Sequence, residues 1–190
     1  MTGKNFLGLC STSTQEQNCV LAFPSEQLNI VQVVYFNKDK DNEVKKFKVH
    51  DTAISMLRLS QDGSMLATAS QKGTLIRIFD PKTEEKMQEL RRGAQQAVIT
   101  DICIDVTNKY VSCASDQGTI HVFNIKKDEA VEREEEADEG QAVLNKKSTF
   151  KGLSGAFSYF GSEWSFQQFK VKDSHCKCAI INNKIFGISK

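Results

Sequence analysis

The sequence predicts an all-β fold, namely a WD40-like β-propeller that is incomplete. Short runs of β-branched and aliphatic residues recur between turn residues, and outside one acidic segment no stretch keeps a helical period. The same turn residues return at a spacing of 45, in the pairs Ser70 and Ser115, Gly73 and Gly118, and Thr74 and Thr119. Propeller blades have four strands and repeat every 40–45 residues or so. The 190 residues therefore hold about three and a half blades of an expected seven-bladed ring.

The first two blades are expected over residues 1–49 and 50–93. Each is delimited by β-branched runs that alternate with Gly, Asp, Asn and Ser turns. In the first blade the predicted strands are 7–10, 19–23, 29–36 and 43–49. In the second they are 53–60, 65–70, 74–79 and 87–90, with tight turns at 61–64 and 71–73.

The third blade is expected over 94–171, and a further blade begins within 172–190. The third blade repeats the strand order of the second, but a long loop at 126–161 separates its last two strands. Its predicted strands are 98–105, 109–115, 119–123 and an outer strand at 164–169. The final segment has predicted strands at 178–181 and 184–189. A loop far longer than a hairpin turn is typically functional or disordered.

Composition excludes several classes of protein. Lys and Arg number 25 against 24 Asp and Glu, so no global charge field favours nucleic acid. At 39% hydrophobic and 26% charged residues the chain has the composition of an ordinary domain with a core. No apolar run reaches the roughly 18–20 residues of a membrane-spanning helix, and Met1 to Phe6 lacks a secretory pattern. We expect a cytoplasmic chain without a transmembrane segment.

The residues that carry catalysis or bind metals are sparse. Cys176 and Cys178 are one residue apart with His175 beside them, which is not the ligand spacing of a structural zinc site. The chain has three histidines, no nucleophile elbow and no Gly-rich phosphate loop before a helix. We therefore expect no metal, no cofactor and no enzymatic activity.

Two adjacent arginines, Arg91 and Arg92, stand where the last strand of the second blade ends. Successive side chains on a strand point to opposite faces, so the two guanidinium groups are expected to diverge toward the flanking blades. Arginine suits phosphate because its planar fork donates two parallel hydrogen bonds and its charge persists. The pair is therefore a candidate for two separate phosphate pockets.

These residues carry a resemblance to a known family. The motif Glu89-Leu-Arg-Arg-Gly93 follows the block Gly73-Thr-Leu-Ile-Arg77 and precedes a block from Ser115 to His121. Together with Gly8-Leu-Cys10, Phe23-Pro24 and Ser162-Glu-Trp-Ser165, it resembles the PROPPIN family, the WIPI-type phosphoinositide-binding propellers of autophagy. The resemblance implies recognition of phosphatidylinositol 3-phosphate and the 3,5-bisphosphate on cytosolic membrane faces. It also implies recruitment of autophagy proteins, with peripheral association at preautophagosomal or phagophore and endosomal membranes.

The resemblance also implies which residues bind the lipid. The first pocket would contain Arg91 with His50, Thr68, Ser70, Gly73, Thr74 and Arg77, and the second Arg92 with Ser115, Thr119 and His121; Gly93 completes the motif. Family members often have a further Ser where this chain has Ala114, so the second pocket is expected to have one hydroxyl fewer. Alternatively, the hydroxyls satisfy local turns, the histidines pack between strands, and Arg77 pairs with a neighbouring strand.

The long loop has two contrasting parts. Residues 128–139 contain eight acids and one Arg, a local charge of −7 whose default interpretation is a solvated tract. Residues 146–160 combine lysines with Phe150, Leu153, Phe157, Tyr159 and Phe160. Lysines can meet lipid headgroups while aromatic rings enter the interface, and in the resembling family the corresponding loop inserts into the bilayer. Alternatively, these side chains pack back on the blade.

Two function classes therefore stay open. The leading hypothesis is a non-catalytic module that selectively binds 3-phosphorylated phosphoinositides and recruits autophagy machinery. The alternative is a WD-repeat scaffold for protein partners without lipid specificity, whose basic edge binds acidic peptides. Preference among phosphoinositides distinguishes the two, since only the first hypothesis predicts it.

Overall fold

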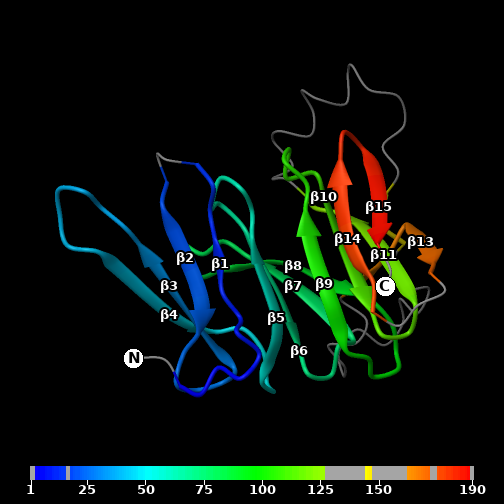
Figure 1. The fold of residues 1–190 in the computed structure, drawn as a ribbon, viewed down its shortest axis with the longest axis horizontal. Helices are drawn as coiled ribbons and strands as arrows, with labels where there is room; N and C mark the ends of the chain where they lie inside the picture. The colour runs from blue at the N-terminus through cyan, green and yellow to red at the C-terminus, as the bar shows by residue number, and fades with distance from the viewer. Residues whose placement is uncertain (1–2, 16–17, 127–143, 147–161, 172–174, 189–190) are drawn as a thin grey trace, which may run out of the picture.

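The computed structural model describes residues 3–15, 18–126, 144–146, 162–171 and 175–188. In these ranges the chain forms strands and turns and contains no helix, which confirms the all-β prediction. The sheets stand side by side in chain order, with the N-terminal sheet at the left of Figure 1 and β14 and β15 at the right. This arrangement confirms an incomplete propeller.

Each blade is an antiparallel meander of consecutive strands. The first blade contains β1 (Ser11–Thr12), β2 (Val20–Pro24), β3 (Ile30–Tyr35) and β4 (Glu43–Lys48). The second contains β5 (Ile54–Leu59), β6 (Leu66–Ser70), β7 (Leu75–Phe79) and β8 (Lys86–Arg91). The third contains β9 (Ile99–Ile104), β10 (Tyr110–Ser115), β11 (Thr119–Asn124) and β13 (Gln167–Lys170). A two-stranded sheet of β14 (Lys177–Ile181) and β15 (Lys184–Ile188) follows.

Two of the predicted strands are wrong. The first strand lies at Ser11–Thr12 rather than 7–10, because Gly8 has a φ of 60° and Asn5 holds a turn through hydrogen bonds to the Leu9 backbone. Trp164 does not begin the outer strand of the third blade. It lies in β12 (Glu163–Trp164), which pairs in parallel with the outer edge of β8 and makes the second blade five-stranded.

The second blade buries two different faces. Leu57, Leu66 and Phe79 pack against the first blade, in a core that includes Val20 and Val31. The alternate residues of the same strands face the third blade, in a core that comprises Ala67, Ala69, Ile76, Ile78 and Leu90 with Ile99, Ile102, Val111, Cys113 and Phe123. This period-two alternation is the pattern of a strand that is buried on both sides. A side chain of this blade therefore faces one neighbouring blade or the other according to its position in the strand.

The inner strands β1, β5, β9 and β14 contact one another in turn. Side chains reinforce these contacts: the Ser11 hydroxyl accepts a hydrogen bond from the Leu59 amide at 2.9 Å. Arg58 donates to the Ile102 carbonyl at 3.0 Å and pairs with Asp101 at 3.1 Å. The other oxygen of the Asp101 carboxylate accepts the Cys178 amide at 3.1 Å, so one buried carboxylate links three inner strands.

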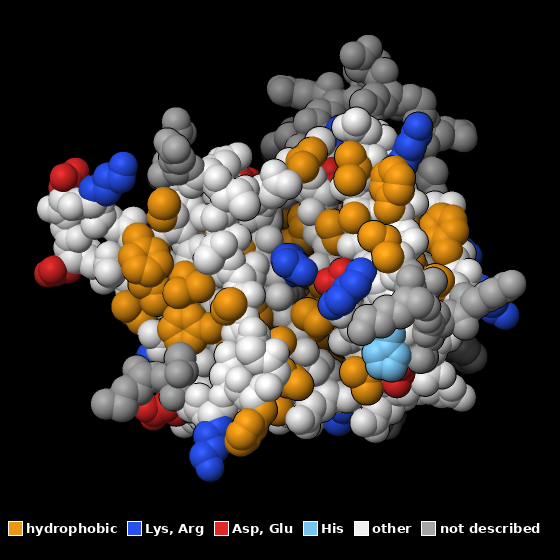
Figure 2. Space-filling model, viewed as in Figure 1, with side chains coloured by type: hydrophobic (Ala, Val, Ile, Leu, Met, Phe, Trp, Pro, Cys, Tyr) orange, Lys and Arg blue, Asp and Glu red, His pale blue; other side chains and the backbone are white. Residues whose placement is uncertain are grey.

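Apolar side chains gather at both sides of the view in Figure 2, over the first blade at the left and around β14 and β15 at the right. The exposed hydrophobic residues include Phe6, Leu7, Phe36 and Val44 on the N-terminal side, and Ile181, Phe186 and Ile188 on the C-terminal side.

Candidate functional site

The Arg91-Arg92 pair lies at the end of β8, and both side chains are buried, at 4% and 6% exposure. Arg91 pairs in register with Leu75, and two residues earlier Glu89 pairs with Arg77, which in turn pairs with Thr68. All of these side chains lie on the face toward the first blade, because Leu66 and Phe79 share it. Arg92 follows on the opposite face, toward the third blade. The chain therefore carries two sites, called here the first site (around Arg91) and the second site (around Arg92).

The polar side chains of the first site are hydrogen-bonded to groups of the protein itself. His50 Nε2 lies 3.0 Å from Thr68 Oγ1, and both residues are buried. Arg77 donates from Nε to Glu89 Oε2 at 2.9 Å and from Nη1 to the Val49 carbonyl at 2.8 Å. Burial lowers the pKa of His50 to about 4, and the neighbouring Arg77 charge acts in the same direction. The imidazole is therefore neutral at pH 7, and Arg77 has a carboxylate partner.

Arg91 is held by a residue from a distant segment. Its Nε donates a hydrogen bond of 2.8 Å to the hydroxyl of Ser162, which is 2% exposed and directly precedes β12. Since β12 runs along the edge of β8, strand pairing brings this hydroxyl to the arginine.

The second site contains a buried arginine bonded to neutral groups. Arg92 donates from Nε to the Gly73 carbonyl at 2.9 Å and from Nη2 to the Gln95 carbonyl. Desolvation lowers the pKa of Arg92, while the nearby Cys113 and Asp116 act in the opposite direction. Within the described residues no carboxylate is paired with this guanidinium. A buried cation without an ion-pair partner is unfavourable, so an anion here would be stabilised.

Four side chains of the third blade share the face toward Arg92. Cys113 pairs with His121 and Ser115 with Thr119 across β10 and β11, and alternation places all four on the side of the core that Cys113 shares with the second blade. Ser115 is fully buried, and among the described residues its hydroxyl has no hydrogen-bond partner. Burying an unsatisfied hydroxyl costs about 1–3 kcal/mol. An anion bound on this face would satisfy both the Arg92 charge and the Ser115 hydroxyl.

His121 completes this face. Its Nδ1 lies 3.2 Å from the Ser165 hydroxyl, and its ring stacks on Phe123 at a centroid distance of 6.3 Å. Burial lowers the pKa of His121 to about 4, and the Arg92 charge acts in the same direction. The ring is therefore neutral at pH 7, like that of His50.

The turn residues of the predicted first pocket are arranged differently from expectation. The Gly73 carbonyl faces Arg92 rather than Arg91, and the Thr74 carbonyl accepts the Arg92 amide at 2.9 Å. Gly73 has a φ of 60°, and a Cβ there would lie 1.8 Å from the Ala97 carbonyl oxygen, so the contact between blades requires glycine. Ser70 is buried, and its carbonyl accepts the Gly73 amide at 2.8 Å. These residues shape the turn between the two sites.

The remaining predicted residues fall into two groups. Gly93 follows Arg92 with open space around it, and the Thr119 hydroxyl donates to the Gln117 carbonyl at 3.5 Å. The predicted membrane-contacting residues Phe150, Leu153, Phe157, Tyr159 and Phe160 lie outside the described residues, as does the acidic tract.

Sequence reasoning assigned no site role to Glu89, Ser162 or Ser165. Glu89 lies inside the Glu-Leu-Arg-Arg-Gly motif, and its distance of two residues from Arg91 predicts a shared face. For the serines the sequence offered only their place in the Ser162-Glu-Trp-Ser165 block, because their partners lie 71 and 44 residues away.

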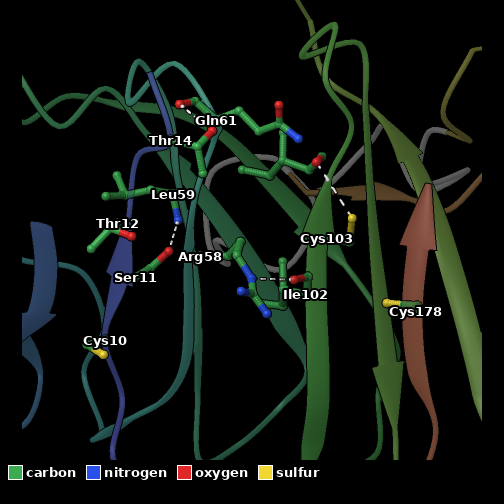
Figure 3. Close-up of a pocket in the computed structure, with 11 residues that line it drawn as sticks. Cys10, Ser11, Thr12, Thr14, Arg58, Leu59, Gln61, Ile102, Cys103 and Cys178 are labelled. Atoms are coloured by element: carbon green, nitrogen blue, oxygen red, sulfur yellow. Dashed lines mark hydrogen bonds between the residues drawn. The ribbon is translucent and has the colours of Figure 1, made fainter. Parts of the chain in front are cut away.

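A separate cavity of about 510 Å³ lies among the inner strands (Figure 3). Its lining includes Cys10, Ser11, Arg58, Cys103 and Cys178, and neither Arg91 nor Arg92 contributes to it. The described part of the chain contains no group of three or more His, Cys, Asp or Glu side chains placed to bind a metal. Within the same ranges no helix is long and apolar enough to cross a membrane.

The fold and the divergent arginine pair define a propeller protein with two polar sites between blades. The sequence model of the PROPPIN family matches residues 2–150. The chain therefore belongs to the PROPPIN family.

Individual relatives agree with this assignment. The chain is 43% identical over 121 residues to autophagy-related protein 18e of Arabidopsis thaliana, covering 64% of this chain and 32% of the relative. Kluyveromyces lactis Hsv2 superposes with a TM-score of 0.72 and 27% identity, over 95% of this chain and 52% of Hsv2. Atg21 of the structure titled "Complex of KlAtg21 with coiled-coil of AgAtg16" gives a TM-score of 0.52 and 28% identity, over 62% of this chain and 39% of that one. The chain thus spans about a third to a half of the length of these relatives.

Proposed function

We propose that this chain binds phosphoinositides that carry a 3-phosphate, with phosphatidylinositol 3-phosphate and the 3,5-bisphosphate as its ligands. The observation that carries the proposal is the second site, where the buried Arg92 has no carboxylate partner among the described residues and lies on the same side as the Ser115 hydroxyl, which has no hydrogen-bond partner there either. A phosphate would supply both the missing negative charge and the missing acceptor or donor.

The first site would bind a second headgroup. Arg91 and Arg92 face opposite neighbouring blades, so one headgroup cannot engage both from the same side. Two linked weak contacts can raise the effective membrane affinity by about 10²–10⁴ over one contact. This supports stable membrane recruitment by two modest sites.

The proposal extends to location and partners. We propose peripheral association with cytosolic faces of preautophagosomal, phagophore and endosomal membranes, where segment 146–160 would add contacts from its lysines and aromatic side chains. Autophagy proteins are the proposed partners, in line with the names of the relatives and the Atg16 coiled coil bound to a structural neighbour.

Flotation with liposomes tests the proposal. Vesicles would contain phosphatidylinositol 3-phosphate, the 3,5-bisphosphate, the 4-phosphate or phosphatidylserine at equal surface charge. We expect the unmodified chain to float with the first two, and the variant Arg91→Thr/Arg92→Thr to stay at the bottom. Lys46→Thr is the control, since it removes a positive charge from an exposed position of β4 that contributes to neither site.

Two outcomes contradict the proposal. One is equal flotation with all four kinds of vesicle, which would favour nonspecific charge attraction. The other is unchanged lipid-selective flotation of the double variant. Circular dichroism of each variant verifies that the loss does not come from unfolding. Binding to a protein partner without preference among the lipids would instead support the scaffold alternative.

A further inference from the structure

Residues 162–165, called here the strap, reach both sites. The strap contains β12, which pairs in parallel with Leu90 and Arg91 of β8. Ser162 at one end contacts Arg91, and Ser165 at the other contacts His121. Both serines are 2% exposed. Four residues therefore connect the first site, which faces the first blade, with the second site, which faces the third.

The strap is fixed at its centre. Glu163 Oε2 accepts hydrogen bonds from Gln88 Nε2 and Asn145 Nδ2, each at 2.9 Å, and Glu163 also pairs with Lys126. Asn145 in turn exchanges two hydrogen bonds with the backbone of Asn124, and Trp164 bridges to Lys146. The residues on both sides of segment 147–161 are thus attached to the same strap.

Ser165 contacts both His121 and Gln168 through its hydroxyl. Gln168 Nε2 donates to the Ser165 hydroxyl oxygen at 3.0 Å, so the hydroxyl proton of Ser165 can be directed at His121 Nδ1. Nδ1 is then the acceptor, and the single proton of the neutral ring is on Nε2. A neutral histidine binds a phosphate oxygen only through an N–H group. This chain of hydrogen bonds selects the tautomer that offers Nε2–H.

The contact of Ser162 acts on the other arginine. The Ser162 hydroxyl accepts from Arg91 Nε, and this bond constrains the direction of the Nε–H group. Because the guanidinium is planar, fixing one nitrogen also fixes the direction in which the others can donate.

We propose that Ser162 and Ser165 are positioning residues of the two sites, with Ser162 orienting Arg91 and Ser165 selecting the Nε2–H tautomer of His121. The inference rests on the proposed function, because it names residues that prepare the same two sites for phosphate. It adds a physical link between the sites and the ends of segment 147–161.

Nuclear magnetic resonance without lipid tests the tautomer. The chain has three histidines, and His121→Gln identifies the signals of His121. In a long-range ¹H–¹⁵N spectrum at pH 7.5, we expect the two ring nitrogens of His121 to show the separated shifts of a single Nε2–H tautomer. In Ser165→Ala these shifts should move toward each other as the tautomers mix, and in Ser165→Thr they should stay separated, because the hydroxyl is restored.

Binding to vesicles with phosphatidylinositol 3-phosphate tests the consequence. We expect Ser165→Ala to weaken binding roughly 3–10-fold and Ser162→Ala roughly 10-fold, since the second contact involves a charged donor. Ser162→Thr and Ser165→Thr should recover most of the affinity. Ser112→Ala is the matched control: Ser112 is also buried in the third blade, but it contacts Cys178 on the face away from His121.

Different results would overturn the proposed function and the positioning role of the two serines. Absence of selective binding by the unmodified chain overturns the proposed function, and with it the role of both serines. Selective binding that persists at full affinity in Ser162→Ala and Ser165→Ala, with unchanged His121 shifts, overturns the positioning role and leaves the proposed function intact. An equal loss in the Ala and Thr variants also overturns it, because a packing defect would then explain the result.

Discussion

The two sites differ in whether they are already satisfied. In the first, Arg77 is paired with Glu89, His50 is bonded to Thr68, and Arg91 to Ser162. In the second, Arg92 donates to neutral carbonyls and the Ser115 hydroxyl has no partner within the described residues. Both arginines are buried, so the difference lies in their partners and not in their exposure.

The absence of a serine at position 114 does not bear on this difference. The sequence predicts one hydroxyl fewer in the second site because Ala114 replaces a serine, but Ala114 packs with Cys176 and Cys178 on the face of the third blade away from Arg92. A ligand gains the most binding free energy where the protein leaves a charge and a hydroxyl unsatisfied, because the ligand then replaces no existing bond. A first-site ligand competes with an existing carboxylate, Glu89. We therefore predict that the second site binds the headgroup more tightly than the first site.

Lowering the pH should affect both sites equally, because each contains a buried histidine, and it has the largest expected effect. The folded-state pKa of His50 and of His121 is about 4, below the ordinary 6.5, because both rings are buried. Between these values the unfolded chain binds protons that the folded chain does not, so stability falls as pH drops from about 6.5 toward 4 and is constant above. Each histidine lowers the free energy of unfolding by about 2 kcal/mol by pH 5 and by about 3 kcal/mol by pH 4. Chemical denaturation at pH 7.5, 6 and 5 measures the loss; a constant unfolding free energy over this range would contradict it.

Removal of one arginine at a time separates the sites. We expect Arg92→Ala to weaken binding of soluble inositol 1,3-bisphosphate about 100-fold and Arg91→Ala about 10-fold, because charge-assisted bonds are worth about 1.5–3 kcal/mol and no carboxylate among the described residues pairs with Arg92. Isothermal titration calorimetry measures both affinities, with Lys46→Ala, at an exposed position of β4, as control. Equal losses, or a larger loss for Arg91→Ala, would show that the partners do not decide the order.

Neutralising Glu89 should make the first site resemble the second. In Glu89→Gln the Arg77 guanidinium loses its carboxylate partner but keeps the Val49 carbonyl. The change is made in an Arg92→Ala background, where headgroup binding depends on the first site alone. There we expect the affinity for the same headgroup to rise roughly 3–10-fold and the melting temperature to fall. Glu85→Gln, on the preceding exposed turn, is the control. Unchanged affinity with lowered stability would assign Glu89 a purely structural role.

Removing the Ser115 hydroxyl has the smallest expected effect, and it should change stability and headgroup affinity in opposite directions. Ser115→Ala deletes a buried hydroxyl that has no hydrogen-bond partner among the described residues, so the free protein should be as stable or more stable, with a melting temperature raised by about 2–4 °C for each kcal/mol gained. Affinity for the headgroup should fall about threefold, because one hydrogen bond to it is lost. A lowered melting temperature with unchanged affinity would show that the hydroxyl serves the fold rather than a ligand.

Local sequence predicted much of this molecule. The 45-residue spacing of Gly73 and Gly118 located corresponding turns of two blades, and both residues have the positive φ that such turns require. Alternation along β8 predicted that Arg91 and Arg92 face different blades; the register of β7 and β8 places Arg91 toward the first blade, and Arg92 lies near Cys113 and His121 of the third. These features depend on residues within one blade, where strand period and turn chemistry act over short distances.

Long-range pairing was not predictable from the same rules. Trp164 follows a long loop, and its residue pattern suits a strand in either of two blades. Its pairing with Arg91 depends on which open strand edge lies within reach once the blades have packed. The contact of Ser162 with Arg91 depends on that same pairing.

The amino-acid sequence by itself determined the repeated four-stranded units, the alternation of buried faces, and two arginines directed to opposite sides of one strand. Only the tertiary structure decided that a carboxylate pairs with Arg77 in the first site while none among the described residues pairs with Arg92, that the Ser115 hydroxyl has no hydrogen-bond partner within those residues, and which serines reach the two sites. The physical reason is that strand period and turn conformation are set by neighbouring residues, whereas the partners of a buried polar group come from whatever segments the packed blades bring within about 3 Å.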